Sequence, residues 1–259
     1  MSEKEDEFTL YLKSDDSLNY YPLNCQNSFI VKLEKTIDVQ NHTEWQLALT
    51  EIIYPNAIAT LHGEQVCVYR DGIVHKIIKY PTVRCSTLKE LVNILNDSGK
   101  SFYQFQLNEH LQRLKLKTKS PYTLQLDQLL CDILCFDQTK FLPGTTVLSS
   151  DCPSLIRHID YLYVYTNIGQ YVIVGDKKVP LLRYFPFSSS SSSTSTKAQN
   201  NSKSFSTLLY VGLVKSHIEH IEVSIRDGAG QLVPFVGENH ASSSLQLVIN
   251  FQPIHRRRY

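Results

Sequence analysis

Histidines are the first residues to test for chemistry, because they are common metal ligands and the chain contains nine of them. Jelly rolls of the cupin type hold a metal with an HxH pair, a glutamate and a later histidine. The sequence has no HxH pair, and His217 and His220 are three residues apart. On a strand these two side chains point to opposite faces, so they cannot reach one ion without a bulge. The spacing therefore predicts a surface or edge role for both.

The sequence signatures of common enzyme classes are missing. It contains no GxSxG nucleophile elbow, no Gly-rich phosphate loop, no HExxH and no EF-hand spacing. Asp15 and Asp16 are adjacent in a polar turn, where solvation accounts for them. A glycosidase needs only two carboxylates that are distant in sequence, so that class stays open. We predict a protein that is not an enzyme and has no cofactor, with a metal-dependent cupin-like enzyme as the weaker alternative.

The cysteines and the N-terminal sequence indicate a reducing compartment, and the net charge argues against nucleic acid as a partner of the chain as a whole. The six cysteines form no CxxC pair, which favours buried free thiols over a metal site or a disulfide framework; they are Cys25, Cys67, Cys85, Cys131, Cys135 and Cys152. The start, MSEKEDE, is acidic, and no apolar run is long enough for a membrane span. We therefore expect no secretory signal, no membrane contact and a reducing compartment. With 26 Lys+Arg against 25 Asp+Glu, the chain as a whole does not attract nucleic acid.

Tyrosines are the most unusual feature of the composition, with 15 in the chain. Tyr161, Tyr163 and Tyr165 alternate with Leu162 and Val164, so the two sets lie on opposite faces of a strand. If the aliphatic side faces the core, the tyrosines form an exposed aromatic stripe of the kind found at protein interfaces. The reverse arrangement, with the tyrosines inside, stays equally open.

The C-terminal residues 252–259 form a basic tail that contains Arg256, Arg257 and Arg258. A short solvated tail is the simpler interpretation. The alternative is a contact with phosphate groups, such as those of nucleic acid, or with an acidic neighbour in an assembly.

Alternating apolar and polar residues predict strands along most of the chain. Residues 66–79 form the clearest hairpin, with Asp71-Gly72 as a two-residue turn. Residues 217–235 predict a second hairpin that turns at Asp227-Gly228. Short helices are expected after a cap at Ser86 or Thr87 and at residues 127–136. Ten or more strands without strand–helix alternation predict an all-β, antiparallel sandwich.

The chain is expected to form one domain, residues 1–259, with insertions. Residues 188–206 are Ser-rich and have no large apolar side chain before Phe205. Such a segment cannot bury enough surface to offset its ordering entropy, so we predict a flexible insertion loop there.

Three segments in order resemble the minor capsid, or penton, protein of Polinton (Maverick) elements and the related adintoviruses. They begin with FTLYLKSDDSLNYYPLN, DYLYVYTNIGQYVIVGD and IEHIEVSIRDGAGQLVPF, and the likeness covers roughly residues 8–55 and 160–251. The resemblance implies a single jelly roll that assembles as a homopentamer at the fivefold vertices of an icosahedral capsid. Its implied partners are further copies of the chain and a major double jelly-roll capsid protein.

A chain of 259 residues is too short for two sandwiches, which favours the minor over the major capsid component. A closed ring needs two different patches on each subunit. The candidate interface residues are Tyr161, Tyr163, Tyr165, Arg226 and Asp227, and Arg256 to Arg258 are candidates for contact with the shell interior or packaged DNA. The virion is the expected location. The alternative function is a carbohydrate- or receptor-binding jelly-roll module.

Overall fold

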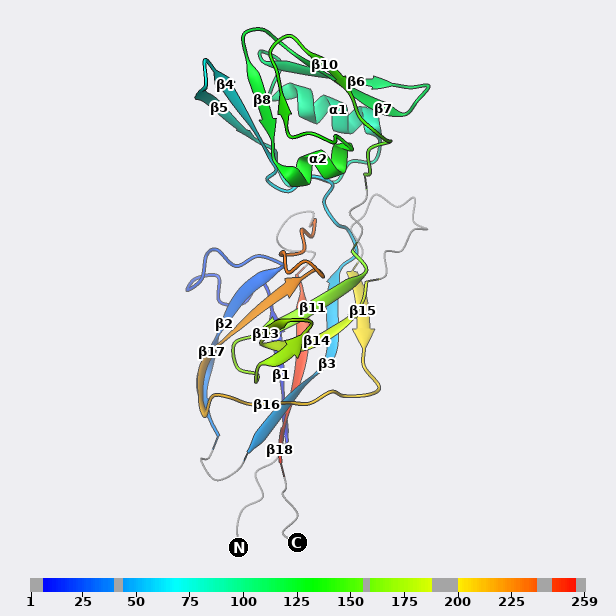
Figure 1. The fold of residues 1–259 in the computed structure, drawn as a ribbon. Helices are drawn as coiled ribbons and strands as arrows, with labels where there is room; N and C mark the ends of the chain where they lie inside the picture. The colour runs from blue at the N-terminus through cyan, green and yellow to red at the C-terminus, as the bar shows by residue number, and fades with distance from the viewer. Residues whose placement is uncertain (1–6, 40–43, 156–158, 188–199, 237–243, 255–259) are drawn as a thin grey trace, which may run out of the picture. The chain divides into compact units, whose positions relative to one another are not determined.

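The computed structural model describes residues 7–39, 44–155, 159–187, 200–236 and 244–254 (Figure 1). The chain divides into two compact units. Unit 1 consists of Met1–Ala57 and Ile159–Tyr259, and unit 2 is Ile58–His158. The sequence predicted one domain with insertions. It did not predict that one insertion, unit 2, builds a hydrophobic core of its own.

Unit 1 contains two antiparallel sheets of four main strands each. In the first sheet the order is β1 (Phe8–Lys13), β18 (Gln246–Pro253), β3 (Trp45–Pro55) and β15 (Asn200–Ser204), and the short β16 (Val211–Gly212) also pairs with β3. In the second sheet it is β14 (Leu181–Pro186), β11 (Tyr161–Thr166), β17 (His217–Arg226) and β2 (Ser28–Asp38). A separate small ribbon pairs β12 (Val172–Val174) with β13 (Lys177–Val179).

The strand order of unit 1 is that of a jelly roll. If its eight main strands are numbered along the chain, the first sheet runs 1-8-3-6 and the second runs 2-7-4-5. Every connection except that from β11 to β14 therefore passes from one sheet to the other. Two Greek keys wrapped in this way define the jelly roll. The predicted fold class, an all-β single jelly roll with two short helices, is confirmed.

A cluster of aromatic side chains packs between the two sheets of unit 1. Tyr54 of β3 is 1% exposed, and its ring centroid lies 5.7 Å from that of Phe185 on β14. Phe187 and Phe235 complete the cluster, at 6.0 and 6.4 Å from Tyr54. Side chains from both inner faces thus fill one core, as in other sandwiches.

The prediction of a flexible Ser-rich loop is wrong for part of its length. Residues 188–199 lie outside the described residues, but Asn200–Ser204 form β15 and pair in register with Glu51–Pro55 of β3. The side chains of β15 are mostly exposed, so hydrophobic periodicity could not reveal it. The strand exists because the edge of β3 offers unpaired backbone groups that need partners.

The predicted hairpin at residues 217–235 is confirmed in its first strand, but its second half pairs only beside the turn. The N–H of Val233 donates to the Ile225 carbonyl at 3.1 Å, and Arg226 bridges to Leu232. Farther from the turn, β2 and β11 occupy the two edges of β17. The second half of the hairpin therefore cannot extend into a regular strand.

Unit 2 combines two sheets with two helices. Its three-stranded sheet has the order β10 (Thr146–Leu148), β7 (Arg113–Thr118), β6 (Tyr103–Asn108), and its four-stranded sheet has the order β5 (Ile73–Lys79), β4 (Gln65–Arg70), β8 (Thr123–Leu126), β9 (Lys140–Phe141). The predicted hairpin is confirmed as β4 and β5, with Asp71 and Gly72 at positive φ. Helices α1 (Leu88–Asp97) and α2 (Gln128–Leu134) confirm both helix predictions, and Thr87 and Asp127 cap them.

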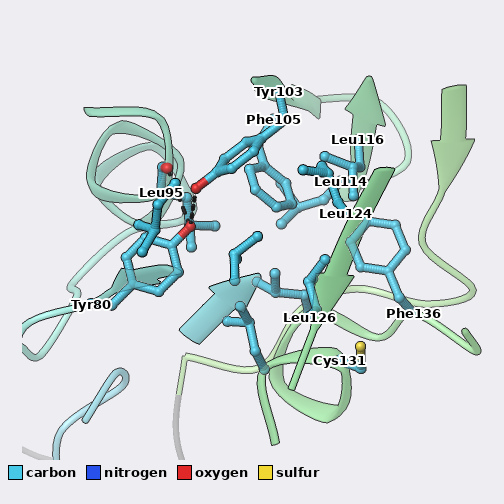
Figure 2. Packing of buried hydrophobic residues seen from close by; sticks show 14 of the residues in the cluster. Tyr80, Leu95, Tyr103, Phe105, Leu114, Leu116, Leu124, Leu126, Cys131 and Phe136 are labelled. Carbon is cyan, nitrogen blue, oxygen red and sulfur yellow. Dashed lines mark hydrogen bonds between the residues drawn. The ribbon is translucent and has the colours of Figure 1, made fainter. Parts of the chain in front are cut away.

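A buried tyrosine pair lies inside the core of unit 2 (Figure 2). The hydroxyl oxygens of Tyr80 and Tyr103 are 2.7 Å apart, and Tyr80 also donates to the Leu95 carbonyl at 3.4 Å. Burial raises the pKa of Tyr103 to about 12 and that of Tyr80 well above its ordinary value, so both stay neutral at pH 7. The hydrogen bonds offset the cost of placing two hydroxyls among aliphatic side chains.

Replacing Gly99 by alanine should destabilise unit 2. A Cβ atom at this position would lie 1.9 Å from Cζ of Tyr103, a side chain that is 1% exposed and hydrogen-bonded to Tyr80. Overpacking of this kind costs about 1–3 kcal/mol in the free energy of unfolding, which urea titration measures. Gly228→Ala is the control, because its Cβ meets nothing within 4 Å. Equal stability of the two variants would contradict the packing around Tyr103.

Candidate subunit interface

Among the described residues, no group of three or more His, Cys, Asp and Glu could hold a metal ion. The described helices likewise include none that is long and apolar enough to span a membrane.

His217 and His220 lie at the surface, paired with carboxylates. His217 is at the start of β17, with Nδ1 2.5 Å from Oδ1 of Asp38 and Nε2 3.2 Å from Oε1 of Glu219. His220 Nε2 lies 3.8 Å from Oε1 of Glu222. The strand register does shift between Ile218 and His220, but each histidine contacts different carboxylates. Of the surface or edge role that their spacing predicts, the structure shows the surface position for both histidines, because β17 is an inner strand of its sheet.

The stability of unit 1 should depend on pH through His217. Hydrogen bonds to Asp38 and then to Glu219 raise the pKa of this imidazole. A histidine whose pKa is higher in the folded than in the unfolded state stabilises the fold when it is protonated. This stabilisation is complete below the unfolded-state pKa of about 6.5 and is lost as the pH rises through the folded-state pKa. Melting temperatures of wild type and His217→Gln should differ most near pH 5 and converge near about pH 8. A difference that is constant over this range would contradict the ion pairing.

The tyrosines of β11 face outward. Leu162 and Val164 are fully buried, Tyr161 is 44% exposed, and Tyr163 and Tyr165 are half-buried. Of the two orientations that the sequence left open, the structure has the one with the aliphatic side chains in the core.

A fourth tyrosine extends this surface from the neighbouring strand. Tyr184 of β14 is 53% exposed and stacks on Tyr163, with ring centroids 5.8 Å apart and planes at 21°. Its ring also lies 6.1 Å from that of Tyr161. We call Tyr161, Tyr163, Tyr165 and Tyr184 the tyrosine face. Sequence reasoning missed Tyr184 because only the pairing of β11 with β14 places it opposite Tyr163.

Arg226 and Asp227 lie close to the tyrosine face, but their side chains make hydrogen bonds within their own turn. Arg226 is opposite Tyr163 in the strand register, and its Nη1 donates to the Gly230 carbonyl at 2.8 Å. The Asp227 carboxylate accepts from the backbone N–H groups of Ala229 and Gln231 at 3.0 and 2.9 Å. These contacts hold the turn at the end of β17, and a role of the two residues in an interface stays a prediction. Arg256, Arg257 and Arg258 lie outside the described residues.

A second apolar surface occurs at the other edge of the same sheet. The segment between β1 and β2 exposes Leu18, Tyr20 and Leu23, which we call the edge loop. Lys32 of β2 contacts the edge loop twice. Its Nζ lies 4.1 Å from the centre of the Tyr20 ring, and its backbone N–H donates to the Ser17 hydroxyl. In the sheet order β14-β11-β17-β2, strand β17 separates the strands of the tyrosine face from β2, beside which the edge loop lies.

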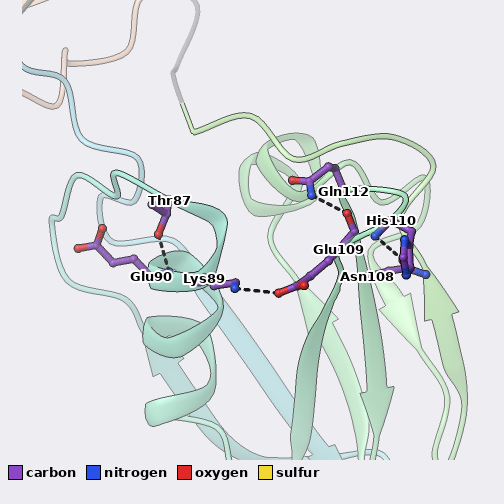
Figure 3. A network of polar contacts seen from close by, with 7 residues as sticks. All are labelled: Thr87, Lys89, Glu90, Asn108, Glu109, His110 and Gln112. Carbon is purple, nitrogen blue, oxygen red and sulfur yellow. Dashed lines mark hydrogen bonds and ion pairs between the residues drawn. The ribbon is translucent and has the colours of Figure 1, made fainter.

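Unit 2 has a shallow groove of about 470 Å³ between the start of α1 and the turn after β6 (Figure 3). Across it the Lys89 ammonium and the Glu109 carboxylate form an ion pair at 2.8 Å. This contact raises the pKa of Lys89 and lowers that of Glu109, so both stay charged at neutral pH. Gln112 donates to the Glu109 carbonyl at 2.7 Å. Because the two charges compensate each other, the ion pair gives the groove no net charge for a ligand.

The solved structures similar to this chain include the mavirus penton protein and a chain of the Sputnik virophage. The mavirus penton protein is 11% identical, with a TM-score of 0.46, and the match covers 96% of this chain and 100% of that one. A chain of the Sputnik virophage is 10% identical, with a TM-score of 0.42 and coverage of 95% and 97%. No family model and no curated protein matches the sequence. Because both TM-scores are below 0.5, the jelly roll is assigned from its strand order alone.

Proposed function

We propose that this chain is a structural minor capsid protein, a penton, that forms homopentamers at the fivefold vertices of an icosahedral capsid of the Polinton and adintovirus type. The observation that carries the proposal is a single jelly roll with two different exposed patches on one sheet, separated by β17. Jelly rolls are common in viral capsids. The three segments that resemble Polinton pentons all belong to unit 1.

The position of the two patches suits a closed ring. In a ring every subunit contacts one neighbour through one patch and the other neighbour through a different patch. The tyrosine face lies over β11 and β14, and the edge loop lies beside β2, so one subunit can present each to a different neighbour. Aromatic rings are favoured in such contacts because they bury a large area with few rotatable bonds.

The size of the jelly roll supports the minor rather than the major capsid role. A double jelly-roll protein needs two such sandwiches. Unit 2 has a three-stranded sheet, a four-stranded sheet and two helices, which is not a second jelly roll. One sandwich per chain suits a vertex protein that meets a separate double jelly-roll protein in the virion.

The basic tail supplies a second role within this proposal. Arg256, Arg257 and Arg258 would contact the shell interior or packaged DNA by charge attraction. Replacing all three by glutamate should reduce genome retention, measured as the DNA content of purified particles. An unchanged DNA content would rule out this role for the tail.

Co-expression with a double jelly-roll major capsid protein tests the vertex assignment. Icosahedral reconstruction of the purified shells should show one jelly roll per subunit around each fivefold axis, with the β-strands of unit 1 fitting the density. Shells whose vertices lack this density, although the chain is present in the cell, would refute the proposal. Glycan-array binding by a monomeric chain would instead support the carbohydrate-binding alternative.

A further inference from the structure

Two cysteines of unit 2 lie side by side at the end of α2. Cys135 caps this helix in a left-handed conformation, with φ 56°. Its sulfur lies 3.3 Å from the carbonyl oxygen of Cys152. The two residues come from segments that are separated by β9 and β10 in the chain.

Backbone hydrogen bonds on both sides of Cys152 hold it in this place. Before it, the N–H of Ser150 donates to the Cys135 carbonyl at 2.7 Å, and the Ser150 hydroxyl donates to the same oxygen at 2.8 Å. After it, the N–H of Ser154 donates to the Ile133 carbonyl at 3.0 Å. The segment around Cys152 is thus attached to the end of α2 at two points, and the Cys135 thiol stays beside the backbone of Cys152.

The other cysteines do not share this arrangement. Cys85 and Cys131 are buried, and burial raises the pKa of each thiol to about 11. Cys25 is exposed, but its sulfur contacts Asn27, and it belongs to unit 1. Cys135 is half-buried and Cys152 is exposed, so a small oxidant in solution can reach this pair. The sequence-based expectation of buried thiols therefore holds for Cys85 and Cys131, whereas Cys67 and Cys135 are half-buried and Cys25 and Cys152 are exposed.

We propose that Cys135 and Cys152 form an intramolecular disulfide when the protein meets a low-molecular-weight disulfide such as oxidised glutathione. The Cys152 thiolate attacks one sulfur of glutathione disulfide, which forms a mixed disulfide and releases one glutathione thiolate. The Cys135 thiolate then attacks Sγ of Cys152, and the bond to the second glutathione breaks. Two protein thiols are oxidised, one glutathione disulfide is reduced to two thiols, and the released thiolates take up the two protons.

The Cys135 thiol is not highly reactive at neutral pH, so the disulfide forms only when an oxidant is present. Burial, and then the neighbouring Asp151 and Cys152, raise the pKa of Cys135, so little thiolate is present at neutral pH. In a reducing cell the pair stays as two thiols. In an oxidising medium the disulfide joins the end of α2 to the segment after β10 and fixes this corner of unit 2. This inference does not depend on the capsid function.

Peptide mapping of the full-length protein tests the proposal. Wild-type protein is incubated with oxidised glutathione, alkylated without reduction, digested and analysed by mass spectrometry. We expect a linked pair of peptides that contain Cys135 and Cys152, two hydrogens lighter than the sum of the reduced peptides. In Cys135→Ser, Cys152 should instead retain a bound glutathione, because the second attack cannot occur.

Cys25→Ser is the control variant, since this exposed cysteine should leave the linked peptides unchanged. The proposal is overturned if wild-type Cys135 and Cys152 both stay alkylatable. It is also overturned if both carry separate glutathiones, because the two sulfurs then do not meet. Neither result bears on assembly at capsid vertices.

Discussion

Tyr184→Asp should weaken self-association of the protein strongly without unfolding it. Tyr184 is 53% exposed and stacks on Tyr163 at the centre of the tyrosine face. In the isolated chain an aspartate at this position stays in water and costs little. In the proposed interface it would be an unpaired buried charge in place of an aromatic anchor. We expect association to weaken by at least about 2 kcal/mol, or roughly thirtyfold in the dissociation constant.

Sedimentation over a range of protein concentrations measures this effect, with Tyr171→Asp as the matched control. Tyr171 is 57% exposed and belongs to unit 1, but it lies outside the tyrosine face. Both variants should keep the wild-type free energy of unfolding within about 0.5 kcal/mol, as surface substitutions usually do. The interface assignment fails if Tyr184→Asp assembles like wild type, or if Tyr171→Asp is equally disruptive.

Tyr54→Ala should cause the largest loss of stability, and the loss should be confined to unit 1. Tyr54 is 1% exposed and contacts the rings of Phe185, Phe187 and Phe235. Removing a buried aromatic side chain leaves a cavity between the sheets and costs about 3–5 kcal/mol. Denaturant titration gives the size of the loss, and Tyr11→Ala, at a tyrosine that is 73% exposed, should change it little.

Hydrogen exchange locates the effect of Tyr54→Ala. Amides of β3, β14 and β18 should exchange faster. Tyr54 belongs to β3, its ring contacts Phe185 of β14, and β18 pairs with β3. Amides of β6 and β7 should keep their protection, since the core of unit 2 is a separate cluster. Equal loss of protection in both units would show that the two cores do not act independently.

Local patterns in the sequence predicted the local elements well. The turn at Asp71-Gly72 encodes its hairpin because both residues adopt positive φ, and Thr87 caps α1 by accepting from the N–H of Glu90. The alternation of Tyr161 to Tyr165 placed these tyrosines on one face, although it could not show which face is buried. That choice depends on what packs against Leu162 and Val164.

Features that depend on contacts between residues far apart in the sequence could not be predicted from local patterns. β15 has polar side chains and exists through backbone bonds to β3, more than a hundred residues earlier in the chain. Tyr184 joins the tyrosine face only through the register between β11 and β14. Cys152 meets Cys135 only because Ser150 and Ser154 bond to the end of α2. Hydrophobic periodicity carries no information on any of these three contacts.

The native mass of the purified full-length protein tests the central claim most directly. Native mass spectrometry, repeated across protein and salt concentrations, separates a closed ring from open or non-specific association. The proposed penton predicts a dominant species of five times the 29.7 kDa chain mass and no series of intermediate sizes, because a closed ring leaves no free patch. A monomer at every concentration, or a dominant dimer or trimer, would contradict the pentameric vertex assembly.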